Sequence, residues 1–221
     1  MKHAYFIAGT DTEIGKTHTA CVLLHAFRAR GFSTVAMKPV AAGVNADGIN
    51  EDVAALRAAA SVDAPLSLIN PWCFADPVAP HIAAREAGVR MRPEVAVEAL
   101  TALGHLADVV IVEGVGGFVV PLDDEGKFDA ADLAGTLGLP IILVVGMRLG
   151  CLNHALLTCE AIERRGLPLA GWIANRVDPD MLRFEENLQT LRSRIAAPCL
   201  GVIPHGASGP EAAAMLLLPT D

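Results

Sequence analysis

The 221-residue sequence has few aromatic residues, no long basic run and no closely spaced pair of cysteines. Its net charge is −8 and its basic residues are scattered, which argues against a broad surface for nucleic acid or anionic lipid. The five cysteines (Cys21, Cys73, Cys151, Cys159 and Cys199) form no C-x-x-C pair, which disfavours a disulfide framework and a zinc site. No apolar run has the length of a signal peptide or a membrane-spanning helix. We therefore expect a cytoplasmic protein with neither nucleic acid nor membrane as a partner.

What the sequence does contain is aliphatic, because 52% of its residues are hydrophobic and only 5% are aromatic. A chain of this length can bury one sizeable aliphatic core, so we predict a single domain spanning residues 1–221. The stretch 41–80 is polar and marked by glycine and proline, and there we expect only partial helix and the least regular loops.

Apolar runs of strand length alternate with stretches of helical spacing. The strand candidates are 4–9, 33–39, 108–114, 140–146, 169–175 and 199–204. The helix candidates are 15–30, 92–107, 129–138, 151–166 and 180–195. Strands that are apolar throughout are typical of a parallel sheet covered on both faces. The order therefore predicts an α/β fold with a doubly wound, mostly parallel sheet, as in the nucleoside triphosphate hydrolases that carry a phosphate-binding loop.

The segment "GTDTEIGKT" (9–17) is a phosphate-binding loop with one extra residue. Five residues rather than four separate its two glycines, and two of the five are the acids Asp11 and Glu13. The helix that begins there would offer free backbone N–H groups to phosphate oxygens. Lys16 would reach the β- and γ-phosphates, and the Thr17 hydroxyl would coordinate Mg²⁺. A glycine turn with a surface lysine is the alternative, but the succession of strand, Gly-Lys-Thr and amphipathic helix favours nucleotide binding.

Further candidates stand where other strands end, because ligands bind at the carboxyl ends of such strands. Lys38 ends the second run, and either faces the same cleft or is a solvated strand-end lysine. Glu113 precedes a glycine-rich turn, and either supports Mg²⁺ or caps a helix. Asn175 ends the fifth run, where its amide could read a donor and an acceptor on a purine edge. Asp52 precedes "VAALRAAA" and is equally well explained as a helix N-cap.

The fourth run leads into "VGMRLGCLNHALL", where another helix is expected to begin. Gly150, Cys151 and Asn153 lie at that helix start, and its N–H groups could hold a carboxylate. Asn153 is equally plausible as an ordinary cap.

Taken together, "GTDTEIGKT", "MKPVAAG", "VEGVGG", "VVGMRLGCLNH" and "GWIANRV" resemble the motifs of dethiobiotin synthetases in content, order and spacing, up to about Pro204. The resemblance implies a homodimeric, ATP-dependent ligase of biotin biosynthesis whose substrate binds near the subunit boundary. Such an enzyme converts 7,8-diaminononanoate, CO₂ and ATP, with Mg²⁺, into dethiobiotin, ADP and phosphate. A substrate amine attacks CO₂ to give a carbamate, the carbamate takes the γ-phosphoryl group to form a carbamic-phosphoric anhydride, and the second amine closes the cyclic urea. The lengthened loop would then face both ATP and the diamine.

The resemblance also implies a role for each matching residue. It implies that Thr12, Lys16 and Lys38 act in catalysis, and that Thr17, Asp52 and Glu113 hold Mg²⁺. For ATP it implies contacts from Glu13, Ile14, Gly15, Lys16, Thr17, His18, Asp52, Glu113, Gly114, Val115, Gly116, Asn175, Arg176, Pro204, His205, Gly206 and Glu211. For the diamine it implies contacts from Lys38 and Ala42 and, in the partner subunit, from Gly150, Cys151 and Asn153. Glu13 has an alternative role as an acceptor for N–H groups of its own loop.

Three positions qualify the resemblance. Ala42 stands where well-known members carry Ser or Thr, which removes a hydroxyl contact to the substrate or carbamate. Arg176 stands where an acid is often found, which affects purine recognition. His81 matches a segment near the substrate, although a lone histidine is more often a local hydrogen-bonding residue.

Two other classes of protein fit parts of the pattern. A partitioning-type switch ATPase of the same fold would be expected to carry a lysine early in its phosphate loop, and there is none between Gly9 and Gly15. A nucleotide-binding module that has lost catalysis is the other alternative. A relative in cobyrinate amidation would need a glutaminase domain, for which 221 residues leave no space.

Overall fold

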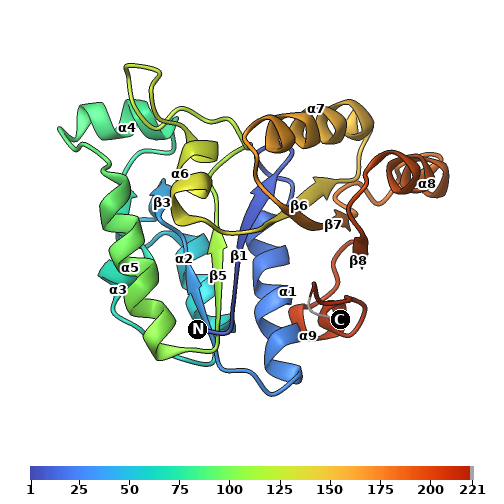
Figure 1. The fold of residues 1–221 in the computed structure, drawn as a ribbon, viewed down its shortest axis with the longest axis horizontal. Coiled ribbons are helices and arrows are strands. Elements are labelled where there is room, and N and C mark those ends of the chain that lie inside the picture. The colour runs from blue at the N-terminus through green and yellow to red at the C-terminus, as the bar shows by residue number, and fades with distance from the viewer. Residues whose placement is uncertain (220–221) are drawn as a thin grey trace.

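The six predicted strands lie side by side in one sheet at the centre of the molecule (Figure 1). The structure is a computed structural model, and it describes residues 1–219. The strands are β1 (His3–Gly9), β2 (Thr34–Met37), β5 (Val109–Glu113), β6 (Ile141–Gly146), β7 (Leu169–Asn175) and β8 (Cys199–Ile203). Their order across the sheet is β2-β5-β1-β6-β7-β8, and every neighbouring pair is parallel. The predicted fold class is therefore confirmed.

Helices cover both faces of this sheet (Figure 1). They are α1 (Lys16–Ala29), α2 (Glu51–Ala59), α3 (Leu66–Ile69), α4 (Pro80–Glu86), α5 (Pro93–Leu106), α6 (Ala130–Leu137), α7 (Cys151–Arg164), α8 (Phe184–Arg194) and α9 (Gly209–Ala213). The five predicted helices correspond to α1, α5, α6, α7 and α8. Local signals set several boundaries: α5 begins at Pro93, and Asp129 and Asp132 form a capping box at the start of α6.

The stretch 41–80 is partly helical, as predicted, but two short strands in or beside it were not expected. Two short strands, β3 (Val40–Ala42) and β4 (Trp72–Phe74), pair in parallel as a separate small sheet. Helices α2 and α3 lie between them in the chain and loops make up the rest, so the expectation of a partly helical stretch with irregular loops is confirmed. Burial explains the second strand, because Trp72 and Phe74 point into the core while the residue between them, Cys73, is exposed.

Two further differences concern the C-terminal part of the chain. Helix α8 begins at Phe184 rather than at residue 180, because Arg183 adopts a left-handed conformation (φ 57°) that a helix cannot include. Helix α9 was not predicted, and a capping box between Ser208 and Glu211 starts it.

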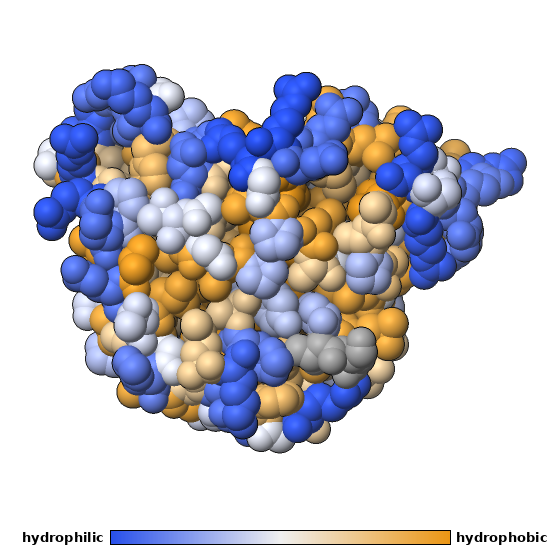
Figure 2. All heavy atoms as spheres, viewed as in Figure 1, coloured by the Kyte–Doolittle hydropathy of each residue, from blue (hydrophilic) through white to orange (hydrophobic). Residues whose placement is uncertain are grey.

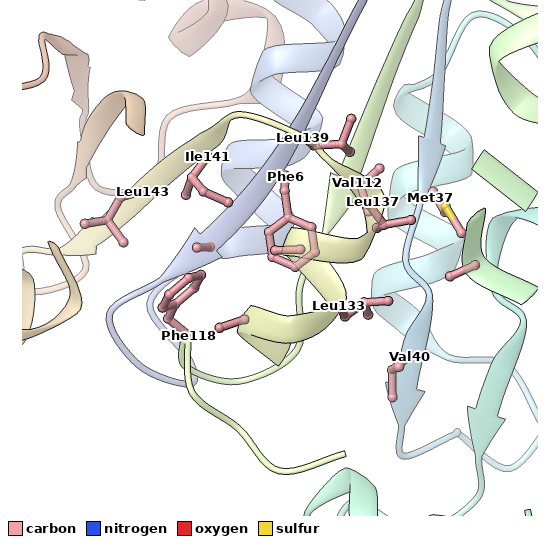
Figure 3. Packing of buried hydrophobic residues seen from close by; sticks show 14 of the residues in the cluster. Phe6, Met37, Val40, Val112, Phe118, Leu133, Leu137, Leu139, Ile141 and Leu143 are labelled. Atoms are coloured by element: carbon pink, nitrogen blue, oxygen red, sulfur yellow. The ribbon is translucent and has the colours of Figure 1, made fainter. Parts of the chain in front are cut away.

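The core consists of two hydrophobic layers on opposite faces of the sheet. Phe6 packs on one side with α6, and Figure 3 shows it near Leu133 and Leu137. Its neighbour in β1, Ile7, belongs to the other layer, which includes residues of α1 and α9. Alternate residues of one strand are therefore buried on both faces, which explains why the strand sequences are apolar without alternation.

Hydrophilic and hydrophobic residues are unevenly distributed over the face seen in Figure 2. Figure 2 shows hydrophilic residues gathered over α4 and towards α8, whereas hydrophobic residues are more frequent over the middle of this face. Among the residues that the structure describes, no helix combines the length and the apolar character needed to cross a bilayer.

Candidate active site

The phosphate-binding loop between β1 and α1 is held in a bent conformation. Gly15 lies in the left-handed region (φ 79°), and Glu13 also has a positive φ of 57°. The Asn175 side chain donates a hydrogen bond from Nδ2 to the Ile14 carbonyl oxygen at 2.8 Å. A Cβ atom at Gly15 would lie 2.1 Å from this Nδ2, so only glycine fits both the conformation and the space.

Asp11, one of the two acids in the loop, accepts two hydrogen bonds that hold the loop in place. Its Oδ1 accepts the backbone N–H of Thr12 at 2.8 Å, and its Oδ2 accepts a hydrogen bond from Arg148 at 2.6 Å. Asp11 thus accepts one N–H group of the loop, the kind of contact that was considered for Glu13. Arg148, which precedes α7, was not predicted as a site residue, although it follows a strand end as the other candidates do.

Lys16 is buried and bends back over its own loop. Its Nζ donates to the Asp11 carbonyl oxygen at 2.7 Å, and a Cβ atom at Gly9 would lie 2.7 Å from the Lys16 Cδ. Burial lowers the pKa of Lys16 to about 8, although the Glu113 carboxylate acts in the opposite direction. The ammonium therefore has one neutral oxygen partner and remains able to turn towards an anion.

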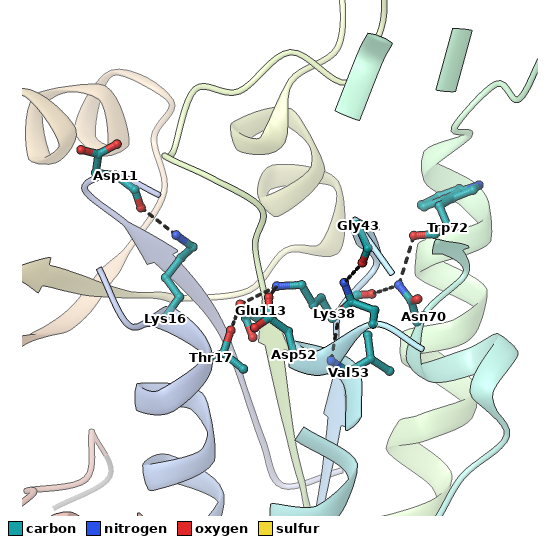
Figure 4. Close-up of polar contacts among 11 residues, drawn as sticks. Asp11, Lys16, Thr17, Lys38, Gly43, Asp52, Val53, Asn70, Trp72 and Glu113 are labelled. Carbon is teal, nitrogen blue, oxygen red and sulfur yellow. Dashed lines mark hydrogen bonds and ion pairs between the residues drawn. The ribbon is translucent and has the colours of Figure 1, made fainter. Parts of the chain in front are cut away.

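A second lysine lies in a cluster of charged groups (Figure 4). Lys38 Nζ is 2.6 Å from Glu113 Oε1 and 2.9 Å from Asp52 Oδ2. Thr17 Oγ1 donates to the same Glu113 Oε1 at 2.8 Å. Lys38 is 5% exposed and Glu113 is 1% exposed. The alternatives of a solvated lysine and of a helix-capping glutamate are therefore wrong.

The charges in this cluster stabilise one another. Burial alone would lower the pKa of Lys38, but Glu113 and Asp52 outweigh it and raise this pKa above its ordinary value. Burial works against ionisation of Asp52 as well, but Lys38, with help from Thr17 and Lys16, holds the pKa of Asp52 below its usual range. The Lys38 ammonium and the Asp52 carboxylate are therefore charged at neutral pH.

Two asparagines support this cluster. Asn50 caps α2, because its side chain accepts the Val53 N–H at 3.1 Å, and Asp52 lies in the first turn of that helix. The interpretation of Asp52 as the N-cap is therefore wrong. Asn70 is buried and donates to the carbonyl oxygens of Lys38 at 2.6 Å and Trp72 at 3.1 Å. Its role was missed, because backbone acceptors leave no trace in the sequence.

The cluster has the oxygen donors that suit Mg²⁺. Magnesium usually binds one or two protein carboxylates and completes its octahedron with water and phosphate oxygens. Thr17, Asp52 and Glu113 supply a hydroxyl and two carboxylates, and Glu113 Oε2 is buried without a hydrogen-bond partner. Among residues 1–219, no group of three or more His, Cys, Asp or Glu side chains could by itself hold a metal ion. One hydroxyl and two carboxylates fit a Mg²⁺ ion whose remaining ligands are phosphate and water oxygens.

These groups line one cavity of about 840 Å³. Of the predicted site residues it brings together Thr12, Glu13, Gly15, Lys16, Thr17, Lys38, Ala42, Asp52, Glu113, Val115 and Gly116. Residues 77–80 and Val120 complete its wall. Ile14 is buried beneath the loop, His18 is half-buried in α1, and Gly114 lies under the Phe6 ring, where a Cβ atom would approach to 2.9 Å.

The residues predicted to contact the nucleotide base lie beyond this cavity. Arg176 donates to the Pro179 carbonyl oxygen at 2.7 Å and stacks over the Phe184 ring, so its guanidinium is turned towards α8. His205 Nδ1 lies 3.2 Å from the Arg176 carbonyl oxygen, in the turn after β8 that contains Pro204 and Gly206. Glu211 accepts hydrogen bonds from Ser208 at the start of α9.

The residues predicted to contact the diamine carboxylate lie at the start of α7. Gly150 precedes the helix with a φ of 96°, and Cys151 and Asn153 are in its first turn. They do not line the 840 Å³ cavity. His81 lies in α4, outside that cavity, and its Nδ1 is buried without a hydrogen-bond partner.

Known proteins resemble this chain in sequence and in structure. The family described as "AAA domain" matches residues 3–208. The "ATP-dependent dethiobiotin synthetase BioD" of Aromatoleum aromaticum is 62% identical over 98% of this chain and 97% of its own length. The protein of the same name from Ralstonia nicotianae is 54% identical over 90% of this chain and 88% of its own length.

Solved structures agree in fold at low identity. The septum site-determining protein MinD of Pyrococcus horikoshii, complexed with Mg-ADP, has a TM-score of 0.57 at 18% identity, over 92% of this chain and 82% of its own. A ParA family ATPase from Chlorobium tepidum has a TM-score of 0.57 at 14% identity, over 97% of this chain and 90% of its own. At these identities the likeness concerns the fold alone, whereas the sequence relatives are close and cover nearly the whole chain. The chain therefore belongs to the ATP-dependent dethiobiotin synthetase family.

Proposed function

We propose that this protein forms dethiobiotin from 7,8-diaminononanoate, CO₂ and ATP, as a Mg²⁺-dependent enzyme of biotin biosynthesis. The observation that carries the proposal is the meeting of the phosphate loop with Lys38, Asp52 and Glu113 around one cavity. Phosphoryl transfer asks little covalent chemistry of a protein, so placing the reactants and stabilising negative charge should dominate the rate.

Each cavity residue has a part in this reaction. Lys16 would leave the Asp11 carbonyl and bind the β- and γ-phosphates. Thr17, Asp52 and Glu113 would hold Mg²⁺, which when bound neutralises charge on the phosphate oxygens. Lys38 would stabilise the carbamate and the phosphoryl group that moves onto its oxygen. The second amine then attacks the carbamate carbon, and phosphate leaves as the ring closes.

The diamine would lie between two subunits. We propose a homodimer in which the start of α7, from Gly150 to Asn153, offers its N–H groups to the substrate carboxylate across the boundary. Leu149, just before this helix, is 95% exposed, which suits a residue that a second copy covers. Ala42 lines the cavity without a hydroxyl, so the diamine would be held there by Lys38 and Thr12.

The nucleotide base would lie towards the ends of β7 and β8. We propose that Asn175 keeps one N–H and its carbonyl for the purine, since it uses a single N–H to hold Ile14. Arg176, Pro204, His205, Gly206 and Glu211 would form the surrounding wall. The whole chain would act as one domain in the cytoplasm, a compartment that suits its five free cysteines.

The test is ATP-dependent phosphate release with Mg²⁺ and bicarbonate, with and without 7,8-diaminononanoate, while mass spectrometry follows dethiobiotin. We expect release that depends on the diamine and matches dethiobiotin one for one. Steady hydrolysis that ignores the diamine would contradict the proposal and support a switch ATPase of the same fold.

A further inference from the structure

The ammonium of Lys38 lies between the two carboxylates assigned to Mg²⁺. Its Nζ is within 2.9 Å of oxygens from both Asp52 and Glu113. Thr17, the third proposed ligand, donates to the same Glu113 oxygen that Lys38 contacts. A divalent cation bound by these three residues and the Lys38 ammonium would therefore compete for the same oxygens.

The Lys38 ammonium and a divalent cation also differ in how many oxygens of the Glu113 carboxylate they can contact. With Lys38 in place, Glu113 Oε1 has two donors while Oε2 is buried with none. A buried carboxylate oxygen without a partner is unfavourable, and a metal ion can engage both oxygens of one carboxylate. Lys38 thus supplies one positive charge to two carboxyl groups and leaves Glu113 Oε2 without a hydrogen-bond partner.

The main chain of Lys38 is fixed while its side chain can move. Its N–H donates to the Ile69 carbonyl at 2.7 Å, and its own carbonyl accepts from Asn70. Four methylene groups separate this anchored backbone from the ammonium, so the ammonium can move into the adjoining cavity by rotation about the side-chain bonds. The other lysine of the site does not share this position, because Lys16 Nζ bonds to the Asp11 carbonyl.

We infer that Lys38 is a resident cation that fills the metal position of the ligand-free protein, and that a divalent cation expels its ammonium into the cavity. The inference rests on the proposed function, which assigns Thr17, Asp52 and Glu113 to the metal. It adds an order of events: Lys38 becomes available to an anionic substrate only after the metal has arrived. Metal binding thereby releases the Lys38 ammonium, which can then bind the carbamate.

The experiment measures Mn²⁺ binding to the full-length, nucleotide-free protein by electron paramagnetic resonance. Lys38→Met removes the competing ammonium, so we expect Mn²⁺ to bind about tenfold more tightly, or better, than to the wild type. Lys38→Arg keeps a cation between the carboxylates and should bind Mn²⁺ no more tightly than the wild type. Lys16→Met is the matched control, because it removes one positive charge from the same cavity but from a different contact, and a change within about threefold is expected.

Two results would overturn the inference. One is a Lys38→Met protein whose affinity for Mn²⁺ is unchanged, lower or undetectable. The other is an equal gain in Lys16→Met, which would mean that only the total charge of the cavity matters. Circular dichroism checks that each variant is folded, and Lys38→Gln replaces Lys38→Met if the latter is not. No diamine is present, so a failure here is distinct from a failure of the wild type to make dethiobiotin.

Discussion

The two ends of β1, β2 and β5 use the same kinds of side chain for opposite purposes. Where the strands begin, Ser33 and Lys2 bind Asp108, which directly precedes β5. Where they end, Lys38 binds Glu113, the last residue of β5. Both are lysine–carboxylate pairs on neighbouring strands, yet their surroundings differ.

At the beginning of the strands, the polar groups satisfy one another near the surface. Asp108 accepts from the Ser33 N–H at 3.1 Å and its hydroxyl at 2.8 Å, and the Ser33 hydroxyl oxygen accepts the Asp108 N–H at 2.9 Å. Beside them the His3, Phe27 and Phe32 rings pack together. At this end Ser33, Asp108 and Lys2 are hydrogen-bonded or ion-paired with one another, so their contacts stabilise the fold without a ligand.

At the carboxyl end, the polar groups are buried and incompletely satisfied. Lys38 and Glu113 are almost inaccessible, one Glu113 oxygen has no partner, and Glu13 has a positive φ. Such features fit a site whose remaining partners come from a bound ligand. The comparison teaches that substitutions at the beginning of the strands should change stability, and substitutions at their ends should change catalysis.

The largest expected effect is on the rate. Lys38→Met should lower kcat about 10²–10³-fold, or about 2–4 kcal/mol, because Lys38 stabilises charge that develops in the reaction. Lys2→Met, which removes the exposed lysine from the other pair, should leave kcat unchanged. Steady-state kinetics give kcat, and calorimetry should show no loss of Mg-ATP affinity in either variant. A parallel loss of ATP affinity in Lys38→Met would break the comparison.

A second substitution tests whether every residue near the site is catalytic. Asn70→Ala should lower the free energy of unfolding by about 1–3 kcal/mol, because two buried carbonyls lose their donor. The matched control is Asn45→Ala, since the exposed Asn45 side chain also makes two hydrogen bonds but to the N–H groups of Asp47 and Ile49 in its own turn. Urea denaturation measures both, and we expect the control to lose less than Asn70→Ala. Equal losses would mean that burial does not decide the outcome.

Two glycines in left-handed conformations, Gly15 and Gly31, lie at opposite ends of α1 and allow the same substitution to be compared at both ends. Gly15→Ala should weaken ATP binding about tenfold for two reasons. The new Cβ would clash with the Asn175 side chain, and the left-handed backbone would add about 1 kcal/mol of strain. Gly31, after α1 at the opposite end, has a φ of 85° and free space around it. Gly31→Ala should therefore lose only about 1 kcal/mol of stability and keep its ATP affinity. Titration calorimetry would contradict this if both variants lost affinity alike.

The smallest expected effect is a pH dependence of stability. The Ser33 backbone N–H and hydroxyl, with Lys2, lower the pKa of Asp108 from 3.8 to about 2. Because the folded-state pKa is depressed, this carboxylate stabilises the fold above pH 3.8 and loses that contribution as the pH falls towards 2. Urea midpoints measured between about pH 2 and 6 should fall less steeply with acid in Asp108→Asn. Identical slopes would show that Asp108 has no part in acid denaturation, and activity at neutral pH should not change.

The fold class could be predicted from the sequence because the strands of the six-stranded sheet carry apolar residues on both of their faces. Strands β3 and β4 were missed, because they are three residues each and too short for any periodic pattern. The order of the strands was not predicted, since it depends on contacts between distant segments. The family resemblance stated from five motifs is confirmed by the close relatives.

The site was predicted where chemistry dictates a residue type. Lys38 and Glu113 stand at strand ends and Lys16 and Thr17 at the start of α1, and the structure brings all four into one cavity. Asn70 was missed because its acceptors are carbonyl groups, which every residue carries. Arg148 was missed although the rule that found Lys38, a charged residue just after a strand, applies to it. The residues assigned to the base, such as His205, stay predictions.

The hydrogen bond from Asn175 to Ile14 has a consequence for the time course of folding. It joins residues 161 positions apart, and β1 itself pairs with β5 and β6, which follow it by about a hundred residues. Contacts of such long range form late, because the intervening chain must first be synthesised and closed into a loop. During translation the phosphate loop leaves the ribosome well before Asn175, yet it can reach its final shape only after residue 175 has followed. The nascent chain should therefore gain the ability to bind ATP in one late step rather than gradually.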